Sequence, residues 1–451
     1  MKFKGLVAAT LALVVLGGLV WWSMKSKPEV SVQPGHEGHD QGQQTGDGPL
    51  MLSLKKDDVQ KLEIRRAEGE TTVVSREGTG PWMISQPKQY AADPDAMTAL
   101  VGALSDLHGE KVVDEQTADF GPYGLKEPVV AITATMKDGK THTVMVGDET
   151  PAGGGFYVRT GADKRLFTMA GFAKAGIDRT AADVRDKRLL TFGKDFVTKL
   201  EVVAKAGTVE FARAGQNDWK IVKPAEMRAD GWQVDELLRK LGEAKLDATV
   251  SDETAAKNER AFASAAVAAT VRLTDLQGVQ TLEARKAKDG LLVKSSEAPG
   301  VHALAADALQ GIEKTAADFR SKKLFDFGFT EPGKVEVTAG GKTRVFVKTG
   351  ETWAEGGKTM DVIGVQSLID RLRDLTAAGF PAKGGGQAEM GITVQAGEKV
   401  EKVTITRLGE KHFAVRAGEA AVYELAGPDV EALRQAAVDV KVSQPKPGGK
   451  K

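Results

Sequence analysis

Three tryptophans at a regular interval constrain the architecture of this chain more than any other feature of its sequence. Trp82, Trp219 and Trp353 stand 137 (219 − 82) and 134 (353 − 219) residues apart, and similar residues surround each of them. A fixed period of this kind is typical of one unit repeated along a chain. The pattern therefore predicts three related units and argues against most enzymes built around a single site.

Strand patterns precede each tryptophan. Each copy contains a lysine-led tetrad in which apolar and polar residues alternate: Lys61-Leu-Glu-Ile, Lys199-Leu-Glu-Val and Lys334-Val-Glu-Val. This alternation predicts hairpins, and it places every tryptophan between a hairpin and a helix. Large rings at such a place bury much area, so we interpret the three tryptophans as structural hubs of the core. The alternative, that the rings stack on a sugar or on a partner's side chain, stays open.

An amphipathic helix is predicted after each tryptophan. Apolar residues recur fifteen, nineteen and twenty-two positions beyond it, and these spacings lie on one helix face. The eighteenth position is leucine in the first two copies but Arg371 in the third, where Ile369 is an apolar neighbour. We therefore expect the third helix to be slightly rotated or less buried.

A second repeat closes the first two copies. The segments Gly176 to Gly193 and Gly311 to Gly328 are identical at 11 of 18 positions. Their basic residues could face lipid headgroups or an acidic partner, or could simply lie at a helix end where cations offset the helix dipole. The third copy ends in residues 428–442 without this basic stretch, as expected of a terminal unit that acts as a cap.

The predicted fold class is α+β, because strands come in runs and do not alternate singly with helices. Three tandem repeated modules of antiparallel strands packed on helices are expected after an N-terminal transmembrane helix. The predicted organisation is a signal anchor at 1–24, a flexible linker at 25–49, modules at 50–193, 194–328 and 329–443, and a disordered tail at 444–451.

The first residues predict a membrane anchor. Lys2 and Lys4 precede an uncharged run from Gly5 to Met24, long enough to span a bilayer, which takes about 17 to 25 residues. Trp21 and Trp22 at its end suit the membrane interface, and no small-x-small cleavage site follows. We favour an uncleaved single-pass anchor in a bacterial inner membrane over a cleaved signal peptide, with the bulk of the chain periplasmic. A narrow lysine bias supports this orientation.

Charge and cysteine content exclude several classes of protein. The 62 basic and 62 acidic residues give a formal net charge of zero, so no global field favours nucleic acid, and no nucleic-acid partner is expected. The chain has no cysteine, which excludes structural disulfides, a cysteine nucleophile and a lipoprotein-type anchor.

Motifs that would mark a reaction are sparse. Three Gly-Lys-Thr triplets lack the upstream glycine of a phosphate-binding loop, and the common hydrolase signatures are absent from the sequence. His36 and His39 have a spacing that could hold a metal ion, but they lie in the predicted linker, where solvated residues are the simpler interpretation. His302 occupies the place of Phe167 and Tyr423 in the other copies and is expected to be a partly buried strand residue. No cofactor and no catalytic residue is predicted.

One segment of the first copy resembles a known family. The stretch from Tyr123 to Met169 contains Tyr-Gly-Leu-x-x-Pro, then Val-Gly-Asp-x-Thr-Pro and Tyr-Val-Arg, and is similar to the hallmark of the domain of unknown function 4340. The matching residues are Tyr123, Gly124, Leu125, Pro128, Gly147, Asp148, Pro151, Tyr157 and Arg159. The resemblance implies a membrane-anchored protein of the bacterial envelope, often encoded beside ABC-type permeases, and implies no catalytic residues.

Three functional hypotheses follow from the sequence. The leading one is a non-catalytic, membrane-anchored extracytoplasmic scaffold or accessory protein that acts with an ABC-type transporter or another envelope assembly. The second is an envelope module that binds a ligand or glycan in the grooves between units. The third is an uncharacterised enzyme, which would require clustered polar residues in a cleft of one unit only.

Overall fold

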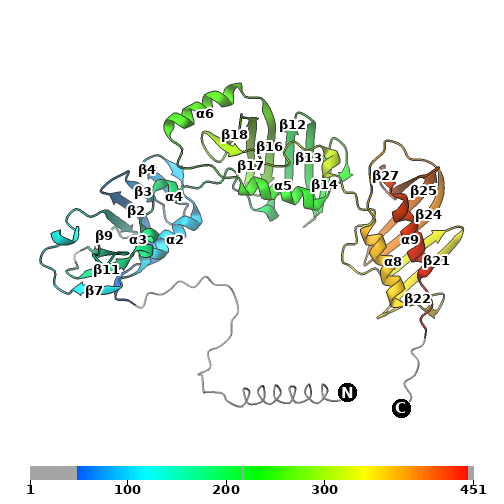
Figure 1. Ribbon diagram of the computed structural model, residues 1–451, viewed down its shortest axis with the longest axis horizontal. Coiled ribbons are helices and arrows are strands. Elements are labelled where there is room, and N and C mark those ends of the chain that lie inside the picture. The colour runs from blue at the N-terminus through cyan, green and yellow to red at the C-terminus, as the bar shows by residue number, and fades with distance from the viewer. Residues whose placement is uncertain (1–47, 162, 216–217, 445–451) are drawn as a thin grey trace, which may run out of the picture.

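The computed structural model describes residues 48–161, 163–215 and 218–444. Within these residues, three large antiparallel sheets follow one another along the chain, each with helices packed on it (Figure 1). We refer to each sheet with its helices as a unit. The expectation of repeated, mostly antiparallel sheets is confirmed. The predicted anchor at 1–24 lies outside the described residues, as does nearly all of the predicted linker and tail.

The helices of the described residues are short. None of them is both long and apolar enough to cross a membrane.

The first unit contains a sheet with the order β5-β4-β3-β2-β8-β9-β10-β11-β7 and a small pair, β1 with β6. The strands are β1 (Leu50–Ser53), β2 (Val59–Arg66), β3 (Thr72–Ser75), β4 (Met83–Gln86), β5 (Tyr90–Ala91), β6 (Asp106–His108), β7 (Lys111–Asp114), β8 (Val130–Met136), β9 (Thr141–Glu149), β10 (Gly155–Thr160) and β11 (Leu166–Ala170). The helices are η1 (Lys56–Asp58), α2 (Pro94–Ser105), η2 (Gly121–Tyr123), α3 (Gly171–Ile177) and α4 (Ala181–Val184).

The second unit repeats this strand order as β15-β14-β13-β12-β16-β17-β18-β19. The strands are β12 (Lys199–Ala204), β13 (Gly207–Gly215), β14 (Asp218–Lys223), β15 (Met227–Arg228), β16 (Val267–Asp275), β17 (Gly278–Lys286), β18 (Gly290–Ser295) and β19 (Val301–Ala305). The helices are η3 (Lys194–Phe196), α5 (Gly231–Glu243), α6 (Asp252–Ser264) and α7 (Ala316–Phe319).

The third unit has the same order again, β23-β22-β21-β20-β24-β25-β26-β27. The strands are β20 (Lys334–Ala339), β21 (Lys342–Thr349), β22 (Thr352–Glu355), β23 (Lys358–Thr359), β24 (Gln387–Ala396), β25 (Lys399–Leu408), β26 (Lys411–Arg416) and β27 (Val422–Leu425). The helices α8 (Val362–Asp374) and α9 (Gly427–Asp439) run side by side over this sheet (Figure 1).

The lysine-led tetrads form the central strands β2, β12 and β20. In β12, Leu200 pairs with Phe211 on one side and with Leu273 on the other. Leu200 and Val202 point into the core, whereas Glu201 lies on the opposite face and forms an ion pair with Arg272 at 2.7 Å. The alternation of the tetrad therefore places the apolar side chains of these strands on the face that packs in the core and their charged side chains on the opposite face.

The structure corrects the expected place of the tryptophans. Trp219 and Trp353 lie within the third strands β14 and β22, and Trp82 directly precedes β4. A further two-residue strand, β5, β15 or β23, follows before the helix. Each tryptophan therefore follows the hairpin of the first two strands and precedes the main helix, as expected, but it lies in or beside a third strand of the same sheet, and a fourth strand comes before the helix.

The structure also corrects the expectation for the third helix. Each main helix begins after an aspartate N-cap, Asp93, Asp230 or Asp361, whose carboxylate accepts from backbone N–H groups of the first turn. Counted from this cap, the residues at positions four, seven, eight and eleven are buried in all three helices. The third helix is therefore neither rotated nor less buried. The expectation failed because it counted from the tryptophan, and the segment from tryptophan to cap is 8 residues in the third copy (361 − 353) but 11 in the earlier copies (230 − 219).

Consecutive units are joined by extended segments that pair with both neighbours. Arg185 forms a β-bridge with Ala92 of the first unit, and Arg188 forms one with Lys245 of the second. At the second junction, Arg320 bridges Ala229 and Lys323 bridges Thr376 in the same way. The side chains that follow, Leu189 with Leu190 and Leu324 with Phe325, pack in the core of the next unit. The basic runs of the closing repeat are thus connections between units.

Candidate functional site

The three tryptophans lie in the three cores. Their side chains are largely inaccessible, with 9% of Trp82, 1% of Trp219 and 2% of Trp353 exposed. The indole N–H of Trp219 donates to Asp235 Oδ1 at 3.3 Å, and Arg213 stacks on its ring at 4.4 Å. Rings buried this deeply make contacts within the unit and present no face to a sugar.

The family-like residues of the first unit come together on the face of the sheet that points away from α2. There the loop around η2 packs against β9 and β10. Gly124 has a φ of +68°, which glycine adopts at no steric cost. A Cβ at Gly147 would stand 2.1 Å from the carbonyl oxygen of Tyr123, so only glycine allows the loop to approach this closely.

Aromatic contacts complete this cluster. The rings of Tyr123 and Tyr157 meet edge to face with centroids 4.9 Å apart, and Arg159 stacks on Phe120 at 4.3 Å. Leu125 is buried beneath the loop. Asp148 lies beside Gly124, Pro128 is half-buried, and Pro151 is exposed in the turn after β9. These contacts hold the loop around η2 against the sheet, and they are packing contacts within the unit.

The second unit covers the equivalent face differently. Helix α6 packs on β18 and β19, where Phe262 forms a small apolar cluster with Leu292 and Val301. Arg285 stacks on the Phe262 ring at 4.5 Å and donates to the Phe262 carbonyl oxygen at 3.0 Å. The same face is therefore closed by a loop in one unit and by a helix in the next.

The histidine candidates are dispersed. His36 and His39 lie outside the described residues. In the part of the chain that the structure describes, no group of three or more histidine, aspartate or glutamate side chains is placed to hold a metal ion. His302 lies on β19 and is partly buried, as expected, and burial lowers the pKa of its imidazole. His412 is buried on β26, with its Nδ1 2.9 Å from Glu389 Oε2.

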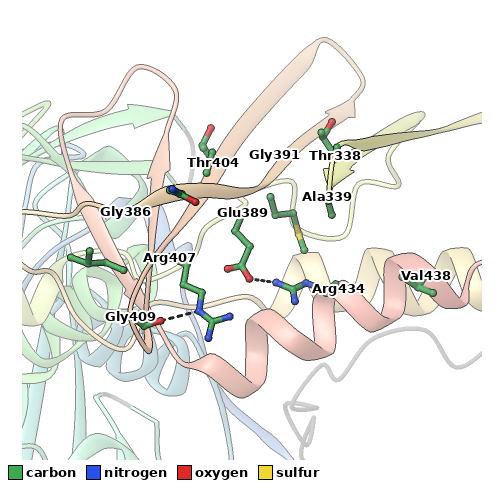
Figure 2. A pocket seen from close by; sticks show the side chains of 16 residues that line it. Thr338, Ala339, Gly386, Glu389, Gly391, Thr404, Arg407, Gly409, Arg434 and Val438 are labelled. Atoms are coloured by element: carbon green, nitrogen blue, oxygen red, sulfur yellow. Dashed lines mark hydrogen bonds and ion pairs between the residues drawn. The ribbon is translucent and has the colours of Figure 1, made fainter.

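A cleft of about 1040 Å³ lies at one end of the third sheet. Glu389 at the start of β24 forms an ion pair with Arg434 of α9, whereas Arg407 is turned toward the carbonyl oxygen of Gly409 (Figure 2). Thr338 and Thr404 point away from α9, on the other side of β24 (Figure 2). The lining residues are thus divided between two faces of the sheet, and they do not converge on one point.

Sequence reasoning missed a partly buried polar network at the second junction. Arg228 Nε donates to Glu419 Oε1 at 2.8 Å, and the Tyr423 hydroxyl donates to Glu419 Oε2 at 2.5 Å. Arg416 joins the network by an ion pair with Glu419 at 2.8 Å, and it forms a second ion pair with Glu401 at 2.9 Å. Burial raises the pKa of Tyr423, and its hydrogen bond to Glu419 raises it further. Arg228 lies 191 residues from Glu419, in a different repeat unit, so no local pattern could reveal their contact.

Comparison with known proteins gives one match. The family model described as domain of unknown function (DUF4340) matches residues 82–220 and 219–393, so two consecutive copies fit it. The second match holds without the Tyr-Gly-Leu-x-x-Pro hallmark, which only the first copy contains. No curated protein matches the chain.

Proposed function

Because the chain belongs to the family of the domain of unknown function 4340, we propose that it is a membrane-anchored accessory protein of the bacterial envelope. In this proposal, three modules stand outside the cytoplasm on one N-terminal anchor, residues 1–24. They form a non-catalytic scaffold for an ABC-type transporter or another envelope assembly. The uncharged run from Gly5 to Met24 supports the anchor.

The observation that carries the proposal is the construction of the junctions. Each connecting segment pairs with the unit before it and the unit after it within four residues, from Arg185 to Arg188 and from Arg320 to Lys323. Little free chain remains between the units, so they are held in a fixed series. Fixed series of repeated units offer the extended surfaces that scaffolds use to bind partners.

Two exposed apolar side chains on these units support a protein partner. Trp232 and Ile363 occupy the same position of α5 and α8, two residues after the aspartate cap, and are 69% and 80% exposed. The first unit has Asp95 at this position. Single exposed apolar residues are ordinary on protein surfaces, but here they recur at the same helix position of two units, and this recurrence is what favours a shared contact with a partner.

Photo-crosslinking in native membranes tests the proposal. A photoreactive residue replaces Trp232 or Ile363 in the full chain, and Glu253, exposed on the separate helix α6, is the control position. We expect positions 232 and 363 to crosslink to an integral membrane protein that mass spectrometry identifies as a transporter subunit, and position 253 to crosslink little. Recovery of the uncrosslinked monomer alone from all three positions would contradict a scaffold role.

A second candidate function is a ligand-binding or glycan-binding envelope module, for which the size of the cleft in the third unit, and not a convergence of its lining residues, is the supporting observation. Its volume of about 1040 Å³ is of the size that small-molecule sites have. Saturable thermal stabilisation of the chain by envelope sugars, abolished by Arg434→Ala, would support this function over the scaffold.

A further inference from the structure

Two arginines occupy equivalent places at the two junctions. Arg185 and Arg320 follow the same Thr-Ala-Ala-Asp sequence with one residue between, and each ends a short helix, α4 or α7. Their backbones are held by the bridges to Ala92 and Ala229. The fold therefore places one guanidinium at each junction in the same way.

Each guanidinium is stacked on an aromatic ring. Arg185 lies 3.8 Å from the ring centroid of Tyr90, and Arg320 lies 3.8 Å from that of Phe380. Tyr90 belongs to the unit before its junction, whereas Phe380 belongs to the unit after its own. The stacking recurs with unrelated aromatic partners, which indicates that the arginine is the common element.

Stacking occupies the flat face of a guanidinium and leaves its N–H donors in the plane available. Within residues 48–161, 163–215 and 218–444, neither side chain has a hydrogen bond or an ion pair. Both are half-buried, and burial lowers the pKa of Arg185. By contrast, the neighbouring Arg188 forms an ion pair with Asp186 at 2.6 Å. A partly desolvated cation without a counter-ion costs free energy. The N–H donors of these two guanidinium groups are therefore suited to an incoming anion.

Both arginines line hollows at their junctions. Arg185 and Tyr90 border a space of about 720 Å³, whose other cations are already paired, Arg66 with Asp178 and Lys88 with Asp252. Arg320 borders a space of about 660 Å³ between the second and third units. Each hollow is therefore large enough for a small group and contains one arginine that the protein itself leaves unpaired.

We propose that each junction is a binding site for a carboxylate, held by the in-plane donors of Arg185 or Arg320. The fork of a guanidinium matches the two oxygens of a carboxylate. Acidic side chains also line the hollows, and they repel a multiply charged group such as phosphate more strongly than a singly charged carboxylate. They are Glu68, Glu70 and Asp252 at the first hollow and Glu226 and Glu419 at the second. The carboxylate comes either from a small free acid or from a polypeptide side chain.

Nuclear magnetic resonance of the full chain with ¹⁵N-labelled arginine tests this assignment. Sodium acetate is titrated while the side-chain Nε–Hε signals are followed, with Arg185→Gln and Arg320→Gln assigning the two sites. We expect saturable shifts at Arg185 and Arg320. Arg239 is the control, because it is exposed and already paired with Glu236 and Glu243 at 2.5 Å. Acetamide, a neutral analogue of acetate, should cause no shift.

A lysine variant, a glutamate peptide and phosphate test the chemistry and the source of the bound carboxylate. Arg185→Lys keeps the charge but lacks the fork, and its acetate binding is followed in uniformly ¹⁵N-labelled chain by the backbone amide signal of Ala92, the bridge partner of residue 185. We expect the acetate affinity at the first junction to fall about tenfold or more, while the melting temperature shows that the variant is folded. A blocked peptide with one glutamate that binds more tightly than acetate would support a polypeptide source, and equal affinity would support a free acid. The proposal is overturned by shifts that do not saturate, by equal shifts at Arg239, or by tighter binding of phosphate than of acetate.

Discussion

At the scale of single residues, Trp219 shows how one side chain can organise a unit. Its ring is buried beneath α5, its N–H is bonded to Asp235, and Arg213 stacks on its face. Trp232, only 13 residues further (232 − 219), is 69% exposed on the same helix. Residue type alone therefore does not predict the role of a tryptophan in this chain. Its burial distinguishes a side chain of the core from one on the surface.

Replacing Trp219 tests its role in the core. We expect Trp219→Ala to lower the free energy of unfolding by about 3–5 kcal/mol, because it removes a large buried ring and leaves a cavity. Trp232→Ala is the matched control and should change stability by less than about 0.5 kcal/mol. Urea unfolding of both variants measures the difference, and equal losses would show that Trp219 is not a core anchor.

Gly147 is tested by adding one carbon. Gly147→Ala places a Cβ against the carbonyl oxygen of Tyr123, and we expect it to destabilise the first unit by about 1–3 kcal/mol through forced backbone movement. Gly176→Ala is the control, since its nearest atom would be a side-chain carbon of Ala103 at 3.7 Å. Thermal unfolding compares the two. A neutral Gly147→Ala would mean that the loop around η2 is not clasped to the sheet.

His302 predicts a pH dependence of stability. Burial lowers the pKa of its imidazole, so the unfolded chain binds the proton more readily than the folded one. The neutral imidazole therefore makes its full contribution to the free energy of unfolding above the unfolded-state pKa of about 6.5. As the pH falls below that pKa, the free energy of unfolding declines by at most about 1.4 kcal/mol per pH unit.

The substitution His302→Phe isolates this contribution, since phenylalanine stands at the equivalent position of the first unit. Melting temperatures are compared between about pH 7.5 and pH 5.5. We expect the wild-type chain to lose more stability than the variant over this interval. Parallel pH profiles would show that His302 does not titrate with unfolding.

At the scale of elements, the aspartate caps set the phase of the main helices. In the first two units, turns containing Pro87 or Pro224 connect the third and fourth strands, whereas the third unit uses a tight turn with Gly356 and Gly357, both at positive φ. The shorter turn moves Asp361 closer to Trp353. Counting from the tryptophan correctly placed Leu368 and Leu372 in the core but wrongly put Arg371 at a buried position of α8, because the helix takes its phase from its own cap.

The caps predict a measurable loss. We expect Asp230→Ala to destabilise the second unit by about 1 kcal/mol, because the N–H of Gln233 then lacks its acceptor. Asp230→Asn retains an acceptor oxygen and should remain close to the wild-type chain. Chemical denaturation distinguishes the two variants, and an equal loss in both would assign the effect to the charge of the residue.

The sequence predicted elements well where a periodic apolar pattern marks them. The alternating tetrads identify β2, β12 and β20, and the apolar stripes identify α2, α5 and α8. Helix α6 was missed because Phe262 is its one buried residue and no stripe marks it. The network of Arg228, Glu419 and Tyr423 was missed because its geometry depends on tertiary packing between units. The stacked arginines were visible as basic residues, but their missing partners were not.

At the scale of the whole molecule, the junctions matter most. Segments that bridge both neighbours and insert apolar side chains into the next core turn three sheets into one continuous series. In the function that we propose, this series stands outside the inner membrane on a single anchor. The chain has no cysteine, so one engineered cysteine reports on its location without background.

Labelling with a membrane-impermeant maleimide tests that claim most directly. Glu253→Cys places a thiol on the exposed surface of α6, and Lys2→Cys places one before the uncharged run from Gly5 to Met24. In spheroplasts, we predict that Glu253→Cys is labelled as fully before lysis as after it, that Lys2→Cys is labelled only after lysis, and that the chain stays with carbonate-washed membranes. Labelling of Glu253→Cys only after lysis, or recovery of the chain in the soluble fraction, would contradict the account.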